Sequence, residues 1–474
     1  MYFTIIPAIL ILGGALSWVI SGDAGLVVGS FTATIIALYT LWDWLFRNAP
    51  TRLSTLLGMG LLLGYGVGAL NTWITLPRTS FTLGEIFGLG QGALARGIAA
   101  VLFSVASLYF LGEIFEKPLF PQNFRLQITE ATRSLIYFAA ICMLLGYATH
   151  SLAIGGAVAS AGHVSIPGMF LSWLYAPVTA LAVAAFVTAK QWRERLLTGV
   201  VSLEFLVMFA VRGRRSALYT TVEILFVLGL AGYRWRGKSI RNVILLGSLG
   251  VVIAVCALVF MLLRIAPVIQ AGYNSASIAQ RAEAANKLVK QGNALALATA
   301  ATRQNAQTRT FVLAFLSNVL DASFNKTPAL GRDALGLMQS TIPSVIDPYK
   351  DRFFSEEDLV DQQFGFGYGD QANSILTGGA TDFGFAGMIL YPLLLVVLAR
   401  VIYGLASILL KPLPLLIVTL ALVQIFMQTE VILSGYFADL RNAIFFGLII
   451  QLFLFFPRLR FGQQQIHPQG RFNV

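Results

Sequence analysis

Long apolar runs separated by short polar segments dominate the chain from residue 3 to residue 457. Each run approaches 20 residues, the length that a helix needs to cross the hydrocarbon core of a bilayer. Backbone amides in lipid must be satisfied within their own segment, so the runs are predicted to be helices. The pattern predicts an all-α, polytopic transmembrane bundle of about 12 spans. The predicted spans are residues 3–20, 25–46, 53–75, 93–115, 133–153, 163–188, 196–211, 216–233, 242–265, 383–408, 413–434 and 439–457.

Composition agrees with a membrane protein. Hydrophobic residues make up 57% of the 474 positions and charged residues 12%, which is half of the about 25% found in soluble domains. The net charge of +11 lies mostly in short loops beside the runs, so it indicates topology and no nucleic-acid partner. Cys142 and Cys256 lie inside apolar runs and are interpreted as small core residues. No disulfide framework, metal site or cofactor is expected.

Every second loop is basic, and this alternation sets the predicted orientation. Cytoplasmic loops of membrane proteins carry an excess of lysine and arginine, so both termini are predicted to be cytoplasmic. The basic residues concerned are Arg47, Arg52, Lys117, Arg125, Arg133, Lys190, Arg193, Arg195, Arg234, Arg236, Lys238, Arg241, Lys411, Arg458, Arg460 and Arg471.

The alternation leaves one long segment, residues 266–382, on the opposite side. It divides the chain into spans 1–9 (1–265), the long external loop (266–382), spans 10–12 (383–457) and a cytoplasmic tail (458–474). Apolar residues recur at helical spacing over 275–301 and 308–323, which predicts amphipathic helices that could lie against the membrane surface. The rest of the loop is rich in glycine, proline and charge, and loops of this length are usually functional or disordered.

The short turn at residues 212–216 is the sharpest anomaly. Arg212, Arg214 and Arg215 occupy a turn that the predicted topology places outside, against the positive-inside bias. One interpretation is a miscounted span, which would make the turn cytoplasmic. The other is an anion site, since arginine presents a rigid fork of donors that suits phosphate oxygens. Arg264, at the outer end of a span, would add a fourth positive charge.

Three acids, Glu204, Glu223 and Glu430, lie within predicted spans. Ionisable groups at membrane depth are costly and usually face a cavity or a partner. Glu204 and Glu223 flank the arginine turn and could form ion pairs with it. A proton relay in a transporter is the alternative interpretation.

The long loop contains a second candidate region, residues 364–370, in which glycines alternate with aromatic residues before Asp370. Such a segment could pack closely against a sugar ring, or could be a plain glycine-rich loop. His150 and His163 fall at outer helix ends and could reach the same side. No metalloprotease, dithiol redox, P-loop or lipase motif occurs, which disfavours those enzyme classes.

A many-span protein with a long external loop before its last helices resembles the bacterial O-antigen polymerase and ligase superfamily. The turn Arg212–Ser216 is similar to the arginine-rich signature at the outer end of a mid-chain helix in these polymerases. The stretches Asn373–Leu376 and Asp382–Gly387 are similar to the end of the long loop. Ligases have a histidine before the asparagine, where this chain has Ala372, and the spacing to the first glycine is about one residue longer. Both departures favour a polymerase over a ligase.

The resemblance implies a metal-independent, inverting transfer of a glycan from an undecaprenyl-diphosphate carrier at the periplasmic face of a bacterial inner membrane. Arginines would stabilise the pyrophosphate leaving group, and an acid or histidine would accept the proton. The implied general bases are, in order, Asp370, Asp382 and His163. The implied substrate-binding residues are Arg212, Arg214, Arg215, Arg264, Arg309, Lys350 and Asn373.

The partners expected on this basis are the lipid-linked oligosaccharide, membrane lipids and, as an open alternative, a chain-length regulator. Other functions stay open: a flippase for lipid-linked glycans, a ligase, a polyprenyl-phosphate glycosyltransferase and a scaffold subunit of a secretion complex. A transporter seldom needs more than a hundred residues on one side, which disfavours the flippase. A single acid, Asp23, in the first external loop disfavours the polyprenyl-phosphate enzyme.

Overall fold

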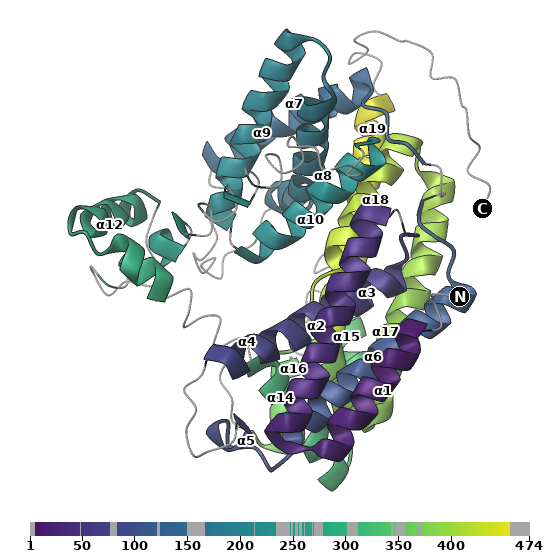
Figure 1. Ribbon diagram of the computed structural model, residues 1–474. Helices are drawn as coiled ribbons and strands as arrows, with labels where there is room; N and C mark the ends of the chain where they lie inside the picture. Colours follow the sequence, from purple (N-terminus) through teal and green to yellow (C-terminus); the bar gives the residue numbers. More distant parts are fainter. Residues whose placement is uncertain are drawn as a thin grey trace.

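A computed structural model describes most of the chain (Figure 1). The described residues are 5–47, 49–75, 83–120, 124–148, 166–212, 214–233, 261–267, 278–300, 311–342, 356–366 and 372–455, with isolated positions at 247, 250, 251, 255, 258, 259, 269 and 346. Within them the chain forms helices and no β-strand, which confirms the predicted all-α class.

The elements follow the apolar runs. The first half contains α1 (Ile5–Ile20), α2 (Gly22–Arg47), α3 (Leu53–Leu61), the π-helix η1 (Leu62–Val67), α4 (Gly68–Thr75), α5 (Leu83–Ile86), α6 (Ala93–Phe115), α7 (Glu130–Ala148), α8 (Ile166–Thr188), α9 (Trp192–Arg212) and α10 (Arg214–Leu230). The second half contains α12 (Ile278–Lys290), α14 (Phe311–Asn325), α15 (Arg332–Ser340), α16 (Glu356–Phe364), α17 (Ile375–Leu409), α18 (Pro412–Phe426) and α19 (Leu433–Phe455).

Most predicted spans coincide with a described helix or, at residues 53–75, with the continuous run α3–η1–α4. The span predicted at 242–265 lies largely outside the described residues. Among the described helices, five are long and apolar enough to cross a membrane, at Gly22–Phe46, Leu53–Ile74, Ala93–Phe115, Ile375–Leu409 and Leu433–Leu454. Large apolar side chains such as Phe115 and Ile408 are exposed on these helices, as expected of surfaces that face lipid. The protein is therefore a helical membrane protein.

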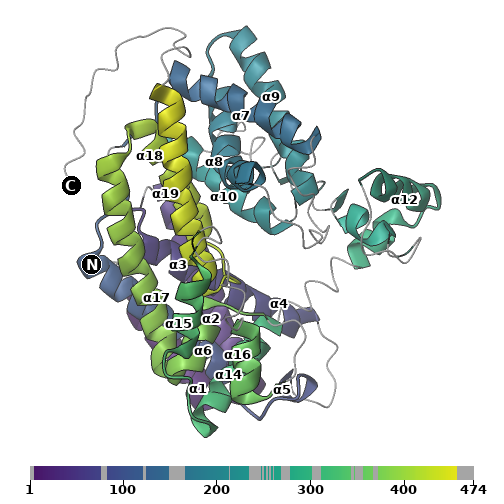
Figure 2. The ribbon, with the colours of Figure 1, turned by 180° about the vertical axis from the view of Figure 1, so that it is seen from behind.

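The helices pack as two groups joined by α18. In the first group, α6 packs against α1, α2, α3, α14 and α17. In the second, α8 packs against α7, α9 and α10. Helix α18 contacts α3 of the first group and α8 and α10 of the second, and α19 lies beside it. Two opposite views show α12 standing apart from both groups (Figures 1 and 2).

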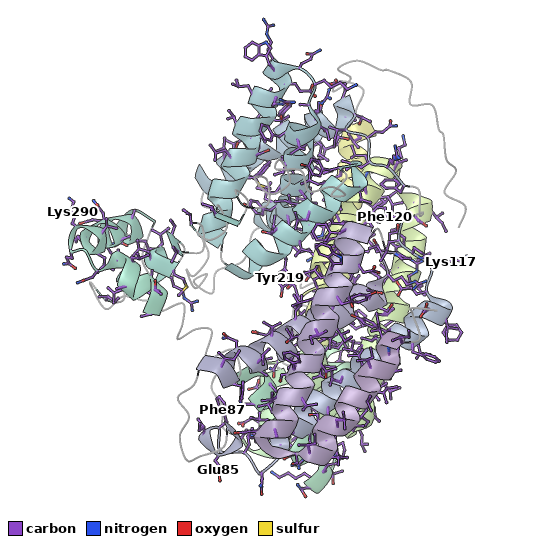
Figure 3. All side chains as sticks on the ribbon, in the orientation of Figure 1. Glu85, Phe87, Lys117, Phe120, Tyr219 and Lys290 are labelled. Atoms are coloured by element: carbon purple, nitrogen blue, oxygen red, sulfur yellow. The ribbon has the colours of Figure 1, made fainter. Side chains whose placement is uncertain are left out.

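Hydrogen bonds collect several loops at one end of the bundle, which we call the basic end. The Leu119 amide donates to the Thr51 carbonyl (2.7 Å), and the Tyr403 hydroxyl donates to the Leu119 carbonyl (3.1 Å). The Leu126 amide donates to the Leu230 carbonyl (2.8 Å). The loops joined in this way include those that carry Arg52, Lys117 and Arg125. Figure 3 shows Lys117 and Phe120 at this end and Glu85 and Phe87 at the opposite end of α6.

The segment predicted as a long loop is partly helical, as expected. The helices predicted over 275–301 and 308–323 are present as α12 and α14. The proposed surface position is wrong for α14, which is buried between α6 and α17. Arg96 of α6 fixes it there, because its Nη2 contacts the Asp321 Oδ2 at 2.7 Å. Apolar residues cover both flanks of α14, and a helix with two apolar flanks is stable only when it is enclosed.

Candidate functional site

The arginine turn lies between α9, which ends at Arg212, and α10, which begins at Arg214. Gly213 and the side chains of the three arginines lie outside the described residues. The backbone alone brings the three positions together, because at most one residue separates the two helices. The first amides of α10 add the positive end of a helix dipole to the turn. This end of α10 is therefore suited to an anion.

Tyr219 lies one helical turn after Arg215, on the same flank of α10. Its hydroxyl is within hydrogen-bonding reach of Thr429, and the Glu430 carboxylate lies close enough to act on it electrostatically. Figure 3 shows Tyr219 between the two helix groups. Polar groups of the segment between α18 and α19 thus lie beside Tyr219, one helical turn from the arginine turn.

Two further tyrosines complete what we call the tyrosine cluster, namely Tyr65, Tyr219 and Tyr436. Tyr65 and Tyr436 are completely buried, and Tyr436 interacts electrostatically with both of the others. The Tyr436 hydroxyl donates to the Gln428 carbonyl (2.7 Å), and the Tyr65 hydroxyl lies 2.6 Å from the Ser374 hydroxyl. Buried hydroxyls are held only where they find partners. The cluster therefore fixes η1, α10, α17 and α19 relative to one another.

Glycines in the third span allow the close approach on which the cluster depends. A Cβ at Gly60 would lie 2.6 Å from the Met427 carbonyl oxygen, and a Cβ at Gly64 would lie 2.1 Å from the Thr429 Oγ1. Thr429 uses this space to donate to the Gly60 carbonyl (2.8 Å). Gly64 lies inside η1, and π-helical turns of this kind occur frequently at functional sites.

Helix α17 begins with a short buried half-helix. Phe383 and Gly384 leave helical geometry, with φ at +60° for Gly384, so residues 375–382 form a separate unit before the long second part. Every residue of that unit is buried. Ser374 caps it: its Oγ accepts from the Leu376 amide (3.1 Å) and the Thr377 amide (3.3 Å). The capped, electropositive end points at Tyr65, in the manner of broken helices that face ligands in membrane proteins.

Asn373, a predicted substrate-binding residue, precedes this cap. Its Oδ1 is buried and has no hydrogen-bond partner among the described residues. A buried amide oxygen without a partner costs free energy, and such a group is a natural contact for a hydroxyl-bearing ligand. Of the residues predicted from the sequence, Asn373 has the geometry that fits ligand binding best.

Asp382, predicted as a general base, is completely buried at the break in α17. Its Oδ1 accepts from the Asp333 amide (3.0 Å), and its Oδ2 accepts from the Ala334 amide (2.9 Å) and the Tyr391 hydroxyl. The carboxylate therefore caps α15 and ties it to α17. A base role for Asp382 stays a prediction, but both of its oxygens are engaged in holding the fold.

The other predicted residues are distributed unevenly. Arg264 is exposed, on a short helical stretch that packs near α12, and no described contact joins it to the arginine turn. Asp370, His163, Arg309 and Lys350 lie outside the described residues. Asn373 thus lies beside the Ser374 cap that contacts Tyr65, and no described contact joins Arg264 to the arginine turn.

Two of the acids within predicted spans, Glu204 and Glu223, have buried carboxylate oxygens. Glu223 is completely buried one turn beyond Tyr219, and neither carboxylate oxygen has a hydrogen-bond partner among the described residues. Glu204 has one buried oxygen without a partner in the same part of the chain. The predicted pairing of these acids with the arginines involves side chains outside the described residues and stays a prediction.

Sequence reasoning missed Tyr65, Tyr219 and Tyr436, as well as Asp439 and Arg441 of α19. Arg441 donates to the Thr341 carbonyl at the end of α15, and its charge acts on the Asp439 carboxylate. A signal was available for the last two, because paired charges inside an apolar span mark function or a buried partner. The tyrosines gave none, since aromatic residues are common in apolar runs.

Comparison with known protein families, with curated proteins and with solved structures finds no match for this chain. The class of the protein therefore rests on its own structure, which is that of a helical membrane protein with a polar cluster buried between two helix groups.

Proposed function

We propose that the protein is a membrane glycosyltransferase that polymerises lipid-linked oligosaccharide repeat units. The observation that carries the proposal is a series of contacts within the tyrosine cluster: Tyr219, one helical turn after the arginine turn, interacts with Tyr436, which interacts with Tyr65 beside the cap of the α17 half-helix. Two electropositive elements beside buried hydroxyls suit a ligand that joins a pyrophosphate to a sugar.

In the proposed reaction, the hydroxyl of one repeat unit attacks the anomeric carbon of another. The bond from that carbon to the diphosphate oxygen breaks, a new carbon–oxygen bond forms with inversion, and the polyprenyl diphosphate leaves with the bonding electrons. Arg212, Arg214 and Arg215 would stabilise the charge that develops on the leaving group. Asn373 and the tyrosine hydroxyls would orient the sugars.

The acceptor hydroxyl must lose its proton to a base within hydrogen-bonding reach. Asp370 remains the first candidate from the sequence, with His163 as an alternative. Glu430 joins them, because it lies beside Tyr219. Asp382 is a weaker candidate, since its oxygens already accept three hydrogen bonds.

The proposed topology has 12 spans, a periplasmic segment at 266–382 and both termini in the cytoplasm of a bacterial inner membrane. It is supported by the hydrogen bonds that gather the basic loops at one end, since a single end of the bundle should carry the cytoplasmic excess of lysine and arginine.

A flippase for lipid-linked glycans is the second candidate function. Glu223 favours it, because this carboxyl group is completely buried and has no hydrogen-bond partner among the described residues, and buried carboxyl groups at membrane depth often belong to proton relays in transporters.

The test is deletion of the gene in its native host, followed by analysis of the surface glycan. Complementation would use wild type, Arg214→Ala, Arg215→Ala and Tyr219→Phe at matched membrane levels. Arg193→Ala is the matched control, because Arg193 lies beside Trp192 at the start of α9, at the other end of that helix from the arginine turn. We expect the deletion to leave single repeat units on lipid, and the two arginine variants to restore less than a tenth of the polymer.

Unchanged polymer length in the deletion strain would overturn the proposal. Accumulation of repeat units on the cytoplasmic face alone would place the flippase first.

A further inference from the structure

A cavity lies at the basic end of the bundle, away from the tyrosine cluster. It is formed where α1 and α3 begin and where α2 and α6 end, and its volume, as space open to the centre of a water molecule, is about 50 Å³. Its polar lining comes from Tyr39, Asp43, Arg52, Tyr109 and Glu113. Neither the proposed transfer reaction nor the arginine turn makes use of this cavity.

The cavity brings both signs of charge together. Arg52 is held by a bond from its Nε to the Glu116 carbonyl (3.1 Å). The Glu116 carboxylate is engaged elsewhere, because it accepts from the Leu53 amide (2.6 Å) and the Ser54 amide (3.0 Å). The carboxylates that line the cavity are those of Asp43, which also makes a contact within the protein, and Glu113. Two carboxylates and one guanidinium around one space suit a ligand that carries both a cation and an anion.

Tyr109 supplies a buried hydroxyl in the same wall. The residue is 8% exposed, and its hydroxyl lies beside Thr40, whose own proton goes to the Ile36 carbonyl (2.8 Å). No hydrogen bond of ordinary geometry reaches this hydroxyl among the described residues. A buried hydroxyl in this condition is available to a ligand donor.

The surroundings of the cavity match the depth of lipid headgroups. Trp42, half-exposed on α2, lies against Phe46 with ring centroids 4.4 Å apart, and Phe115 at the end of α6 is 78% exposed. Tryptophan and tyrosine are enriched where a membrane meets water, which fits the position of Trp42. Above them, α1 and α2 expose apolar side chains such as Ile9 and Leu38, along which acyl chains can lie.

We propose that this cavity binds the headgroup of a zwitterionic phospholipid that carries a primary amine. The ammonium group lies between Asp43 and Glu113, with Tyr109 as a further acceptor, and the phosphate lies at Arg52. A primary ammonium has three N–H donors for these oxygens, whereas a trimethylammonium group has none. The acyl chains remain in the bilayer, outside the cavity.

The test uses the full-length protein in detergent, with lipids that share the same acyl chains. The thermal midpoint would be measured with phosphatidylethanolamine, phosphatidylcholine and phosphatidylglycerol. We expect the ethanolamine lipid to raise the midpoint by about 2 °C or more above the other two, because a ligand that binds only the folded state stabilises it. Asp43→Asn and Glu113→Gln should remove that advantage. The control Asp23→Asn, at the other end of α2, should keep it.

Native mass spectrometry of the same samples provides a second measurement should a variant lose stability for other reasons. Wild type is expected to retain the ethanolamine lipid through detergent exchange, and Glu113→Gln to lose it. Equal shifts with all three lipids in wild type would overturn the proposal. So would equal protection by soluble phosphoethanolamine, because the ligand would then be a free amine and no lipid.

Discussion

At the residue scale, two carboxylates lie side by side where α15 meets the break in α17. Asp382 accepts three hydrogen bonds, two of them from the first amides of α15. Asp333 is 3% exposed, and its Oδ2 has no hydrogen-bond partner among the described residues. The two acids have opposite effects, because the first satisfies buried donors and the second is an unsatisfied group that burial penalises.

Asp382→Ala should destabilise the protein by about 3 kcal/mol, because it leaves two amides and a hydroxyl buried without partners. Thermal unfolding in detergent would measure the effect, with Glu283→Ala on the exposed face of α12 as control. An exposed ion pair of that kind contributes little. If Asp382→Ala kept the wild-type midpoint and lost all polymer, the carboxylate would act in catalysis instead.

Asp333 predicts a pH dependence of stability. Burial, followed by the negative charge of Asp382, raises the pKa of the Asp333 carboxyl from 3.8 to about 7. Between these values the folded state binds more protons than the unfolded state, so stability falls as pH rises from about 4 to about 7. The stability that comes from keeping the Asp333 carboxyl protonated is complete below about pH 4 and lost above about pH 7.

We therefore expect Asp333→Asn to raise the thermal midpoint at pH 8 and to change it little at pH 4.5, where the wild-type carboxyl is mostly protonated. Midpoints measured across pH 4.5 to 8 would show a flatter profile for the variant. Parallel profiles for variant and wild type would contradict this assignment.

At the element scale, the break in α17 depends on two glycines in contact. The half-helix turns back on the long second part, so that a Cβ at Gly387 would lie 1.8 Å from the Gly379 carbonyl oxygen. Both neighbours are backbone atoms and cannot move aside as a flexible side chain would. The half-helix, its Ser374 cap and Asn373 all follow this contact.

Gly387→Ala should therefore lower the thermal midpoint strongly, with a cost of about 2 kcal/mol or more. Gly404→Ala in the same helix is the matched control, because no atom lies within 4 Å of the added Cβ. Alanine in an open helix position is expected to stabilise by about 0.5–1 kcal/mol. Similar midpoints for the two variants would show that the close contact does not exist.

Hydropathy predicts elements well where a run is long and uniformly apolar. The span predicted at 93–115 has the same bounds as α6. The same method places the start of a span at 383 but gives no sign of the buried half-helix before it, because residues 375–382 contain threonines and glycines as a loop would. It also misses the π-helix at 62–67. Gly60 and Gly64 are needed there because they pack against Met427 and Thr429, which are distant in the sequence.

At the scale of the whole molecule, the candidate site depends on contacts between distant parts of the chain. Tyr65 and Ser374 are 309 positions apart, and Gly60 and Thr429 are 369 apart. No local pattern announces such pairs. The arginine turn could be noticed in the sequence because three arginines in a turn predicted to be external oppose the positive-inside bias. The tyrosine cluster could not, because it depends on how α18 joins the two helix groups.

The two ends of the bundle give the last prediction, which concerns topology. Glu85 and Lys117 are exposed near opposite ends of α6 (Figure 3), and the basic end should face the cytoplasm. In a variant with both native cysteines replaced, Glu85→Cys should react with a membrane-impermeant maleimide in intact spheroplasts. Lys117→Cys should react only after the membrane is opened. Because one 23-residue helix joins the two regions, the pair must respond in opposite ways. Reaction of both sites from outside would mean that α6 does not cross the membrane. Reversed reactivity would mean that the orientation is opposite to the predicted one and that the arginine turn faces the cytoplasm.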